Sequence, residues 1–245
     1  YMFYSCRKIK KVPLFNSTNC VNMAYMFSRC LQMEEVGLMD TQNVTRMDYM
    51  FEYCYKLINV PFFNTQNVTN MEYMFRESYK LQYIPEFNTQ NVVNMQWMFA
   101  IYSTAQFQHN TLKEVPHFNT SSVTNMYAMF YGQSSITSVP HFDTSNVTNM
   151  GSMFSSCLSL KTVPPFDTSK VTSFYNTFIN CNQLKEVPFF NLPKCISIQG
   201  AFSGCVSLHT LGGLNTYDAG ATVSNLTNMR DTFNNCRRLQ EIQLF

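Results

Sequence analysis

Nine cysteines and four histidines are the residues of this 245-residue chain whose chemistry could serve a metal site or a nucleophile. Seven of the cysteines share one place in a repeating pattern, three residues after a recurring phenylalanine: Cys6, Cys30, Cys54, Cys157, Cys181, Cys205 and Cys236. Cys20 and Cys195 share a second place, where Val68 stands in another copy. No two cysteines are spaced Cys-x-x-Cys, and one ligand per copy cannot assemble a tetrahedral zinc site. We therefore expect the cysteines to pack in the interior as small hydrophobic residues, and we expect no cofactor.

Histidine and carboxylate side chains form one row that could bind a metal. His117 and His141 occupy the same repeat position in consecutive copies, and Glu86 occupies it one copy earlier. This position varies between copies, as an exposed site without a packing constraint does, so the three residues are weak candidates and we predict no metal site. The chain also lacks Gly-x-Ser-x-Gly, His-Glu-x-x-His and a phosphate-binding glycine loop. We therefore predict no catalytic residues and no enzyme activity; hydrolysis or transfer is a remote alternative.

An aromatic row is the first candidate for ligand binding. Tyr25, Tyr49, Tyr73 and Trp97 stand two residues before the recurring phenylalanine in four consecutive copies. On a helical turn this position lies about 150° from the apolar stripe, so the rings should point outward at about 5 Å spacing. Aromatic rows stack on sugar rings and anchor protein partners, whereas the alternative is packing of neighbouring copies on one another. In later copies the position holds Ala128, Ser152, Asn176, Gly200 and Asp231.

Two added segments supply further candidates. Two copies are seven residues longer than the others, and the additions fall within 100–111 and 216–224. Insertions in solenoids emerge as loops, often on the binding face. The first addition carries Tyr102, Phe107 and His109, so we add Tyr102 and Phe107 to the ligand-binding candidates. The second addition has the composition of a plain turn.

These residues are positioned by a repeat that runs along the whole chain. Seven of its intervals are 24 residues and two are 31, measured between these phenylalanines: Phe3, Phe27, Phe51, Phe75, Phe99, Phe130, Phe154, Phe178, Phe202 and Phe233. A 24-residue unit cannot close a hydrophobic core alone, so it must stack on its neighbours. The spacing predicts a single solenoid over 1–245, with nine units and a partial tenth. Because the chain begins and ends inside a unit, we expect it to be a segment of a longer protein.

Each unit is expected to contain a strand, a corner and a helical turn. Residues 57–60 predict a parallel strand of three or four residues, because Pro61 has no N–H to donate. Asn64 and Thr65 predict a corner, since such side chains bond to nearby backbone amides. The apolar spacing then predicts a short helical turn: Val68, Met71, Met74 and Phe75. Residues 45–48 and 69–72 read as capping boxes at its start. The expected fold class is therefore an α/β repeat solenoid similar to a leucine-rich repeat.

The repeat resembles the leucine-rich-repeat surface proteins called BspA-like, in the branch with a Phe-Asp/Asn-Thr-x-Asn-Val-Thr-x-Met-x-x-Met-Phe core. The resemblance covers essentially the whole chain and is strongest over 51–99 and 140–154. Similar arrays occur in mycoplasmal, phage and protist proteins. The resemblance implies display on a surface and binding rather than chemistry.

Composition excludes several classes of protein. The net charge of +2 gives no reason to expect a nucleic-acid partner, and no run of apolar residues is long enough to span a bilayer. We therefore predict an extracellular recognition or adhesion module, on a bacterial cell or a virion, that binds a host glycan or protein. The alternative is a structural spacer that contacts neighbouring subunits of a larger assembly.

Overall fold

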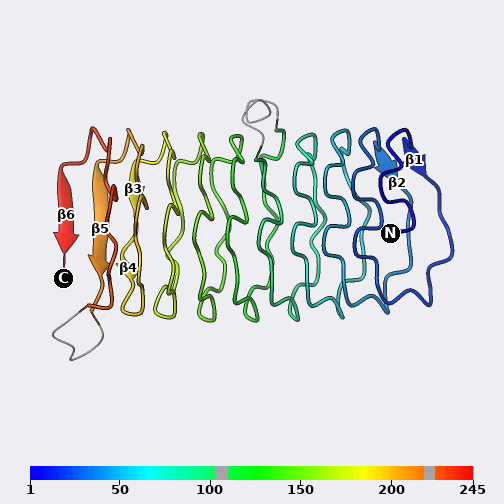
Figure 1. Ribbon diagram of the computed structural model, residues 1–245, viewed down its shortest axis with the longest axis horizontal. Coiled ribbons are helices and arrows are strands. Elements are labelled where there is room, and N and C mark those ends of the chain that lie inside the picture. The colour runs from blue at the N-terminus through cyan, green and yellow to red at the C-terminus, as the bar shows by residue number, and fades with distance from the viewer. Residues whose placement is uncertain (103–109, 218–223, 245) are drawn as a thin grey trace.

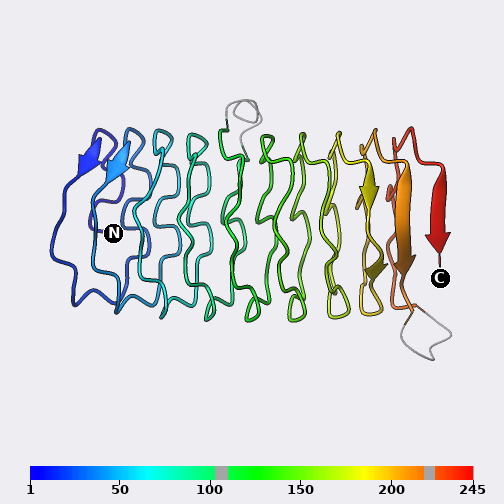
Figure 2. The same ribbon diagram turned by 180° about the vertical axis from the view of Figure 1, so that it is seen from behind.

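The computed structural model describes residues 1–102, 110–217 and 224–244 and shows a column of stacked rungs (Figure 1). Figure 2 shows the same succession of rungs from behind, from the N-terminal to the C-terminal end. Each rung has two legs whose apolar side chains meet between them: Phe51 of one leg stacks on Phe63 of the other, with ring centroids 6.1 Å apart. The repeat solenoid is therefore observed, whereas the prediction of one domain over all of 1–245 includes undescribed residues and stays a prediction.

The strands are parallel, and most are shorter than expected. β1 (Lys11–Val12) pairs with β2 (Glu35–Val36), and a second sheet holds β3 (Glu186–Val187), β4 (Phe190–Asn191), β5 (Thr210–Asn215) and β6 (Glu241–Leu244). β3 ends before Pro188, which cannot donate to the ladder. β5 runs on through Gly212, which stands where Pro188 does in the preceding rung, and an added Cβ there would lie 2.8 Å from the backbone N of Phe189.

The expected helical turn is wrong, because the described residues contain no helix. Three overlapping turns replace it, in which Met26, Ser28 and Cys30 donate their N–H groups to the carbonyls three residues earlier at 3.1–3.2 Å. The intervening N–H groups donate to carbonyls of the next rung at 2.7–3.0 Å: those of Tyr25, Phe27 and Arg29. A spacing of three between apolar residues suits both structures. A helix this short is marginal, whereas stacked rungs offer every second N–H a partner.

The predicted capping boxes are also wrong. The Thr45 hydroxyl donates to the carbonyl of Val21 in the preceding rung at 3.3 Å. The N–H of Glu72 donates to Oδ1 of Asn70 at 3.0 Å, so an Asn side chain does locally what the capping pair was expected to do.

Among the described residues, no helix is long and apolar enough to cross a membrane.

Two positions of each rung have a positive φ. One is the residue two before the repeat phenylalanine, which we call the ring position, and the other is two after it. Ile101 stands at the second position but is not among the positive-φ residues. A β-branched residue is strained in that conformation, and the turn opens here, at the start of the first added segment.

The core is a column of identical side chains. The ten repeat phenylalanines stack on one another with centroids 5.4–5.7 Å apart. Six of the nine cysteines are buried beside them, as expected: Cys30, Cys54, Cys157, Cys181, Cys195 and Cys205. Cys20 and Cys236 are partly buried against the core, and the expectation is wrong for Cys6, which is exposed in the first rung. The thiol of Cys54 also donates to the carbonyl of Phe27 at 3.2 Å, and the Ser78 hydroxyl makes the same contact to Phe51 at 2.7 Å. The side chain three residues after the repeat phenylalanine thus packs in the apolar core and also donates a hydrogen bond to a backbone carbonyl of the preceding rung.

The Asn-Thr corners are confirmed and link neighbouring rungs. Oδ1 of Asn64 accepts the N–H of Gln66 at 3.2 Å, as expected for a local turn. The Thr65 hydroxyl reaches further and donates to the carbonyl of Asn88 in the next rung at 2.8 Å. These corners therefore hold both the bend and the stacking distance.

Candidate binding face

Four rings at the ring position form one continuous stack with the N-terminal tyrosine. Tyr1 and Tyr25 are 5.0 Å apart, Tyr25 and Tyr49 4.3 Å, and Tyr49 and Tyr73 4.5 Å between centroids. Trp97 follows Tyr73 at 6.1 Å with an interplanar angle of 6°. We call Tyr1, Tyr25, Tyr49, Tyr73 and Trp97 the aromatic stack. The structure thus brings the four predicted residues together at nearly the predicted spacing.

The rings of the aromatic stack cover one another's faces. Tyr25, Tyr49, Tyr73 and Trp97 are all half-buried rather than pointing freely into solvent. A sugar cannot stack on a ring face that a neighbouring ring already covers at van der Waals distance. What the stack presents is therefore a strip of ring edges and hydroxyl groups.

A carboxylate and an amide form hydrogen bonds along the edge of the strip where the tyrosine hydroxyls lie. The Tyr49 hydroxyl donates to Oε1 of Glu72 at 3.3 Å, and the Asn94 amide donates to Oε2 of the same carboxylate at 2.9 Å. Burial raises the pKa of Tyr49 above its ordinary value, and the nearby Glu72 carboxylate raises it further. The phenol therefore stays protonated and can donate a hydrogen bond throughout the physiological range.

An arginine lies against the rings at the end of the stack. The Arg76 guanidinium carbon is 5.3 Å from the Tyr73 ring centroid and 5.6 Å from that of Trp97. The same guanidinium pairs with the buried Glu52 carboxylate at 3.2 Å, which also accepts the Ser28 hydroxyl at 3.2 Å. Burial raises the pKa of Glu52, while Arg76 opposes the shift. This network fixes the rings, because cation–π contacts and an ion pair both resist their rotation.

The stack ends in a cluster beside the first added segment. Trp97 contacts Tyr127 edge-on at 5.6 Å and Tyr131 at 5.5 Å, and Tyr102 stacks on Tyr131 at 5.6 Å. The backbone N–H of Tyr102 donates to the buried Glu77 carboxylate at 2.5 Å. The sequence candidate Tyr102 therefore does join the aromatic surface. Tyr127 and Tyr131 were missed because they hold other repeat positions, where a search along a single position cannot find them.

The remaining candidates do not converge on a site. Glu86, His117 and His141 are exposed, and no three His, Cys, Asp or Glu side chains could hold a metal ion in the ranges that the structure describes. Phe107 and His109 lie outside the described residues.

Comparison with known proteins identifies the family to which the repeat is similar. A family model described as "Mycoplasma protein of unknown function, DUF285" matches residues 1–114 and 102–217. The match confirms the resemblance that the repeat motif indicated. A comparison with curated proteins found no match.

Several solved structures are similar to the chain. A leucine-rich repeat protein from T. pallidum is 18% identical, with 81% of this chain and 72% of that chain covered and a TM-score of 0.42. A leucine-rich repeat protein from Eubacterium ventriosum is 17% identical, with 98% and 74% covered and a TM-score of 0.44. A leucine rich cell surface protein from Faecalibacterium prausnitzii is 15% identical, with 98% and 81% covered and a TM-score of 0.37.

Proposed function

The chain belongs to the family described as Mycoplasma protein of unknown function, DUF285, and from that premise we propose that it is a non-catalytic recognition module on a cell or virion surface. Its partner is a protein that binds along the aromatic stack. The observation that carries the proposal is the presence of large rings, in four consecutive rungs, at a position with positive φ.

Large rings at this position carry a conformational cost. Tyr25, Tyr49, Tyr73 and Trp97 have φ between 56° and 58°. A bulky non-glycine residue in this region costs on the order of 1–3 kcal/mol and persists only where other interactions require it. Stacking between the rings offsets part of that cost, since an aromatic pair contributes about 0.5–1.5 kcal/mol beyond burial. A recognition function is a second reason to keep the rings.

The geometry favours a protein over a glycan for this strip. Its ring faces are covered, so a sugar has no open platform within the stack. Its edges and hydroxyls offer what protein interfaces use most, namely amphipathic aromatic groups that are already rigid. Fixed rings also lose little side-chain entropy on binding.

A second candidate function is a structural spacer in a larger surface assembly. The observation that favours it is that the aromatic stack has its contacts within the chain: the rings cover one another, and the Tyr49 hydroxyl donates a hydrogen bond to Glu72. In that case the rings serve only to stiffen the first half of the column.

The test screens the folded chain against arrays of host-surface proteins and glycans beside a variant whose rings are replaced. The replacements take residues from the same position of later rungs: Tyr25→Ala, Tyr49→Ser, Tyr73→Asn and Trp97→Gly. The proposal expects a protein that binds the chain and not the variant, while circular dichroism and melting show that the variant is folded. Binding that survives in the variant contradicts the proposed face. No binding by either folded chain favours the spacer, and loss of a glycan alone would show that the edges recognise sugars.

A further inference from the structure

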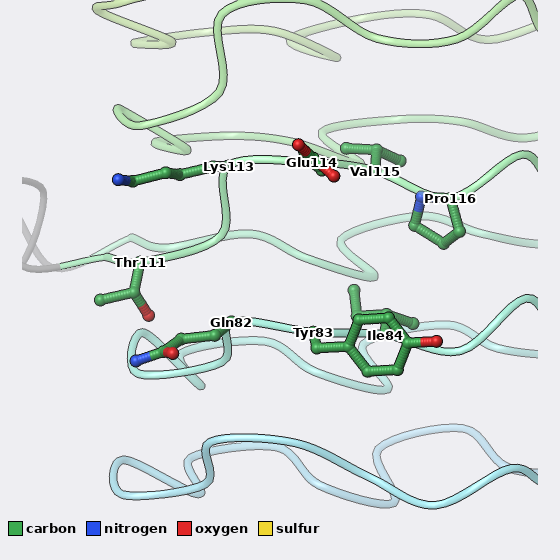
Figure 3. Close-up of a pocket in the computed structure, with 8 residues that line it drawn as sticks. All are labelled: Gln82, Tyr83, Ile84, Thr111, Lys113, Glu114, Val115 and Pro116. Atoms are coloured by element: carbon green, nitrogen blue, oxygen red, sulfur yellow. The ribbon is translucent and has the colours of Figure 1, made fainter.

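A hollow opens between two rungs directly after the first added segment. It has a volume of about 540 Å³ and lies between residues 82–84 of one rung and 113–116 of the next (Figure 3). The Thr111 hydroxyl closes one end by donating to the carbonyl of Leu81 at 3.0 Å. The volume falls in the range of about 300–1,000 Å³ that ligand pockets occupy.

Local sequence alone does not decide whether this stretch pairs with its neighbour. Residues 113–116 read Lys-Glu-Val-Pro, and residues 185–188 read the same. At the second copy β3 pairs with β5 in a parallel ladder. At the first copy no backbone hydrogen bond joins 113–116 to 82–84 within the described part of the chain. The same four residues form no backbone hydrogen bond to 137–140 of the following rung either, so pairing on this side of the column is interrupted on both sides of 113–116 among the described residues.

Tyr83 offers the open ring face that the aromatic stack lacks. Its side chain is 64% exposed, and within the described ranges it contacts no other aromatic ring and no guanidinium. It is also the only aromatic residue at its repeat position among the described rungs, where Asn59 and Glu114 are neighbours in the column. Val115 and Pro116 of the next rung also line the hollow and are partly exposed, so they supply an apolar wall. A flat, unoccupied ring next to an apolar wall suits the apolar face of a sugar ring.

Polar groups around Tyr83 are free to bind. The side chains of Gln82, Lys113 and Glu114 are exposed, and none has a hydrogen-bond or ion-pair partner among the residues that the structure describes. Lys113 and Glu114 are neighbours on one edge of the hollow and carry opposite charges, so neither an anion nor a cation is favoured. An amide, an ammonium and a carboxylate together supply donors and acceptors for a neutral ligand rich in hydroxyl groups.

We propose that this hollow binds a neutral oligosaccharide, with a pyranose ring stacked on Tyr83 and hydroxyls bonded to Gln82, Lys113 and Glu114. The inference rests on the proposed function only in treating the chain as a recognition module. The sugar and the protein partner use different residues, so the two proposals can fail separately.

The test measures binding of neutral glucose-, galactose- and N-acetylglucosamine-based oligosaccharides by saturation-transfer NMR and calorimetry. We expect Tyr83→Ala to weaken binding of the responding sugar about tenfold or more, and Tyr83→Phe to keep most of it, because stacking needs the ring and not the hydroxyl. Lys113→Ala with Glu114→Ala should weaken it as well. The matched control is Lys185→Ala with Glu186→Ala, the same pair in the paired ladder, which should leave it unchanged.

Three results of the sugar measurements would overturn the proposal. They are no binding of any of these sugars, unchanged affinity in Tyr83→Ala, and equal loss in both Lys-Glu variants. In the unmodified chain, Tyr83 ring resonances should shift on titration with sugar, so a folding defect in a variant does not remove the test. Capture of an extended peptide at Tyr83 without any sugar would also overturn it. The chain with a replaced aromatic stack should bind the sugar normally, even if its protein partner is lost.

Discussion

The first and second halves of the column share a backbone at the ring position but not a side chain. Its φ is 56–58° in the rungs that carry Tyr25, Tyr49, Tyr73 and Trp97. It is 52–61° in the later rungs, which carry Ala128, Ser152, Asn176, Gly200 and Asp231. The later residues are small, or are types that tolerate this conformation. The backbone therefore does not require an aromatic ring at this position, so something other than the backbone conformation must account for the aromatic stack in the first half.

The second half fills the same space differently. A Cβ added at Gly200 would collide with Oδ1 of Asn176, so the asparagine of one rung covers the glycine of the next. In the first half, the Tyr49 ring lies over the Tyr73 ring at 4.5 Å. The two halves are thus alternative solutions for packing successive turns, and each excludes the other's side chains.

The largest expected effect comes from moving a ring into the second half. Gly200→Tyr would add positive-φ strain and a collision with Asn176, so we expect a loss of roughly 3 kcal/mol or more in the free energy of unfolding. Chemical denaturation measures it. Adding Asn176→Gly to the variant should recover part of the loss, and an unchanged stability in Gly200→Tyr would show that the two halves are interchangeable.

Removing a ring from the first half should cost less. Tyr49→Ala loses contacts to Tyr25 and Tyr73 and the hydroxyl bond to Glu72, so we expect about 2 kcal/mol of destabilisation. Asp231→Ala, at the same position of a late rung, should change stability by about 0.5 kcal/mol or less. Equal effects of the two substitutions would mean that the stack contributes nothing special to folding.

Tyr49→Phe removes only the hydroxyl and should lower the free energy of unfolding by about 0.5–1 kcal/mol near neutral pH. Because burial raises the pKa of Tyr49, the native state favours the protonated phenol, and that contribution is complete below pH 10 or so. It is lost as the pH rises through the raised pKa. Denaturation curves from pH 8 to 12 should therefore fall more steeply for the unmodified chain than for Tyr49→Phe. Parallel curves would contradict the burial of this hydroxyl.

The smallest effect concerns the carboxyl beneath the rings. Burial raises the pKa of Glu52 above 4.5, so its stabilising contribution is complete below that pH and is lost as the pH rises through the raised value. Between pH 4.5 and 7, the unmodified chain should lose stability relative to Glu52→Gln. Ser155→Ala, at the same repeat position in the second half, provides a control without a titrating group. A pH profile of Glu52→Gln that parallels the unmodified chain would count against the burial of an ionisable group.

Sequence alone could predict the parts of this molecule that repeat. The 24-residue spacing identifies the phenylalanine column, the interior cysteines and the Asn-Thr corners, because each follows from a residue type at a fixed position. It could not distinguish a helix from consecutive turns, since Val68, Met71 and Met74 fit both. The distinction depends on whether the N–H of Tyr49 bonds within its rung or to Glu72 of the next.

Features that depend on how neighbouring rungs are arranged could not be predicted. Lys-Glu-Val-Pro occurs at 113–116 and at 185–188, yet only the second copy pairs in a ladder. The contact of Tyr102 with Tyr131 likewise follows from how the rung opens after Ile101. Local sequence is identical or uninformative in these places, and the arrangement of neighbouring rungs decides the result.

The most direct test of the recognition face compares two sets of substitutions at one repeat position. One chain carries the four ring replacements described above, and the other carries Ser152→Ala, Asn176→Ala and Asp231→Ala. Surface plasmon resonance would measure both against the protein partner found on the array, at a temperature where both chains are folded. The account predicts at least about a tenfold loss of affinity for the first chain and none for the second. Equal affinities, or equal losses, would contradict it.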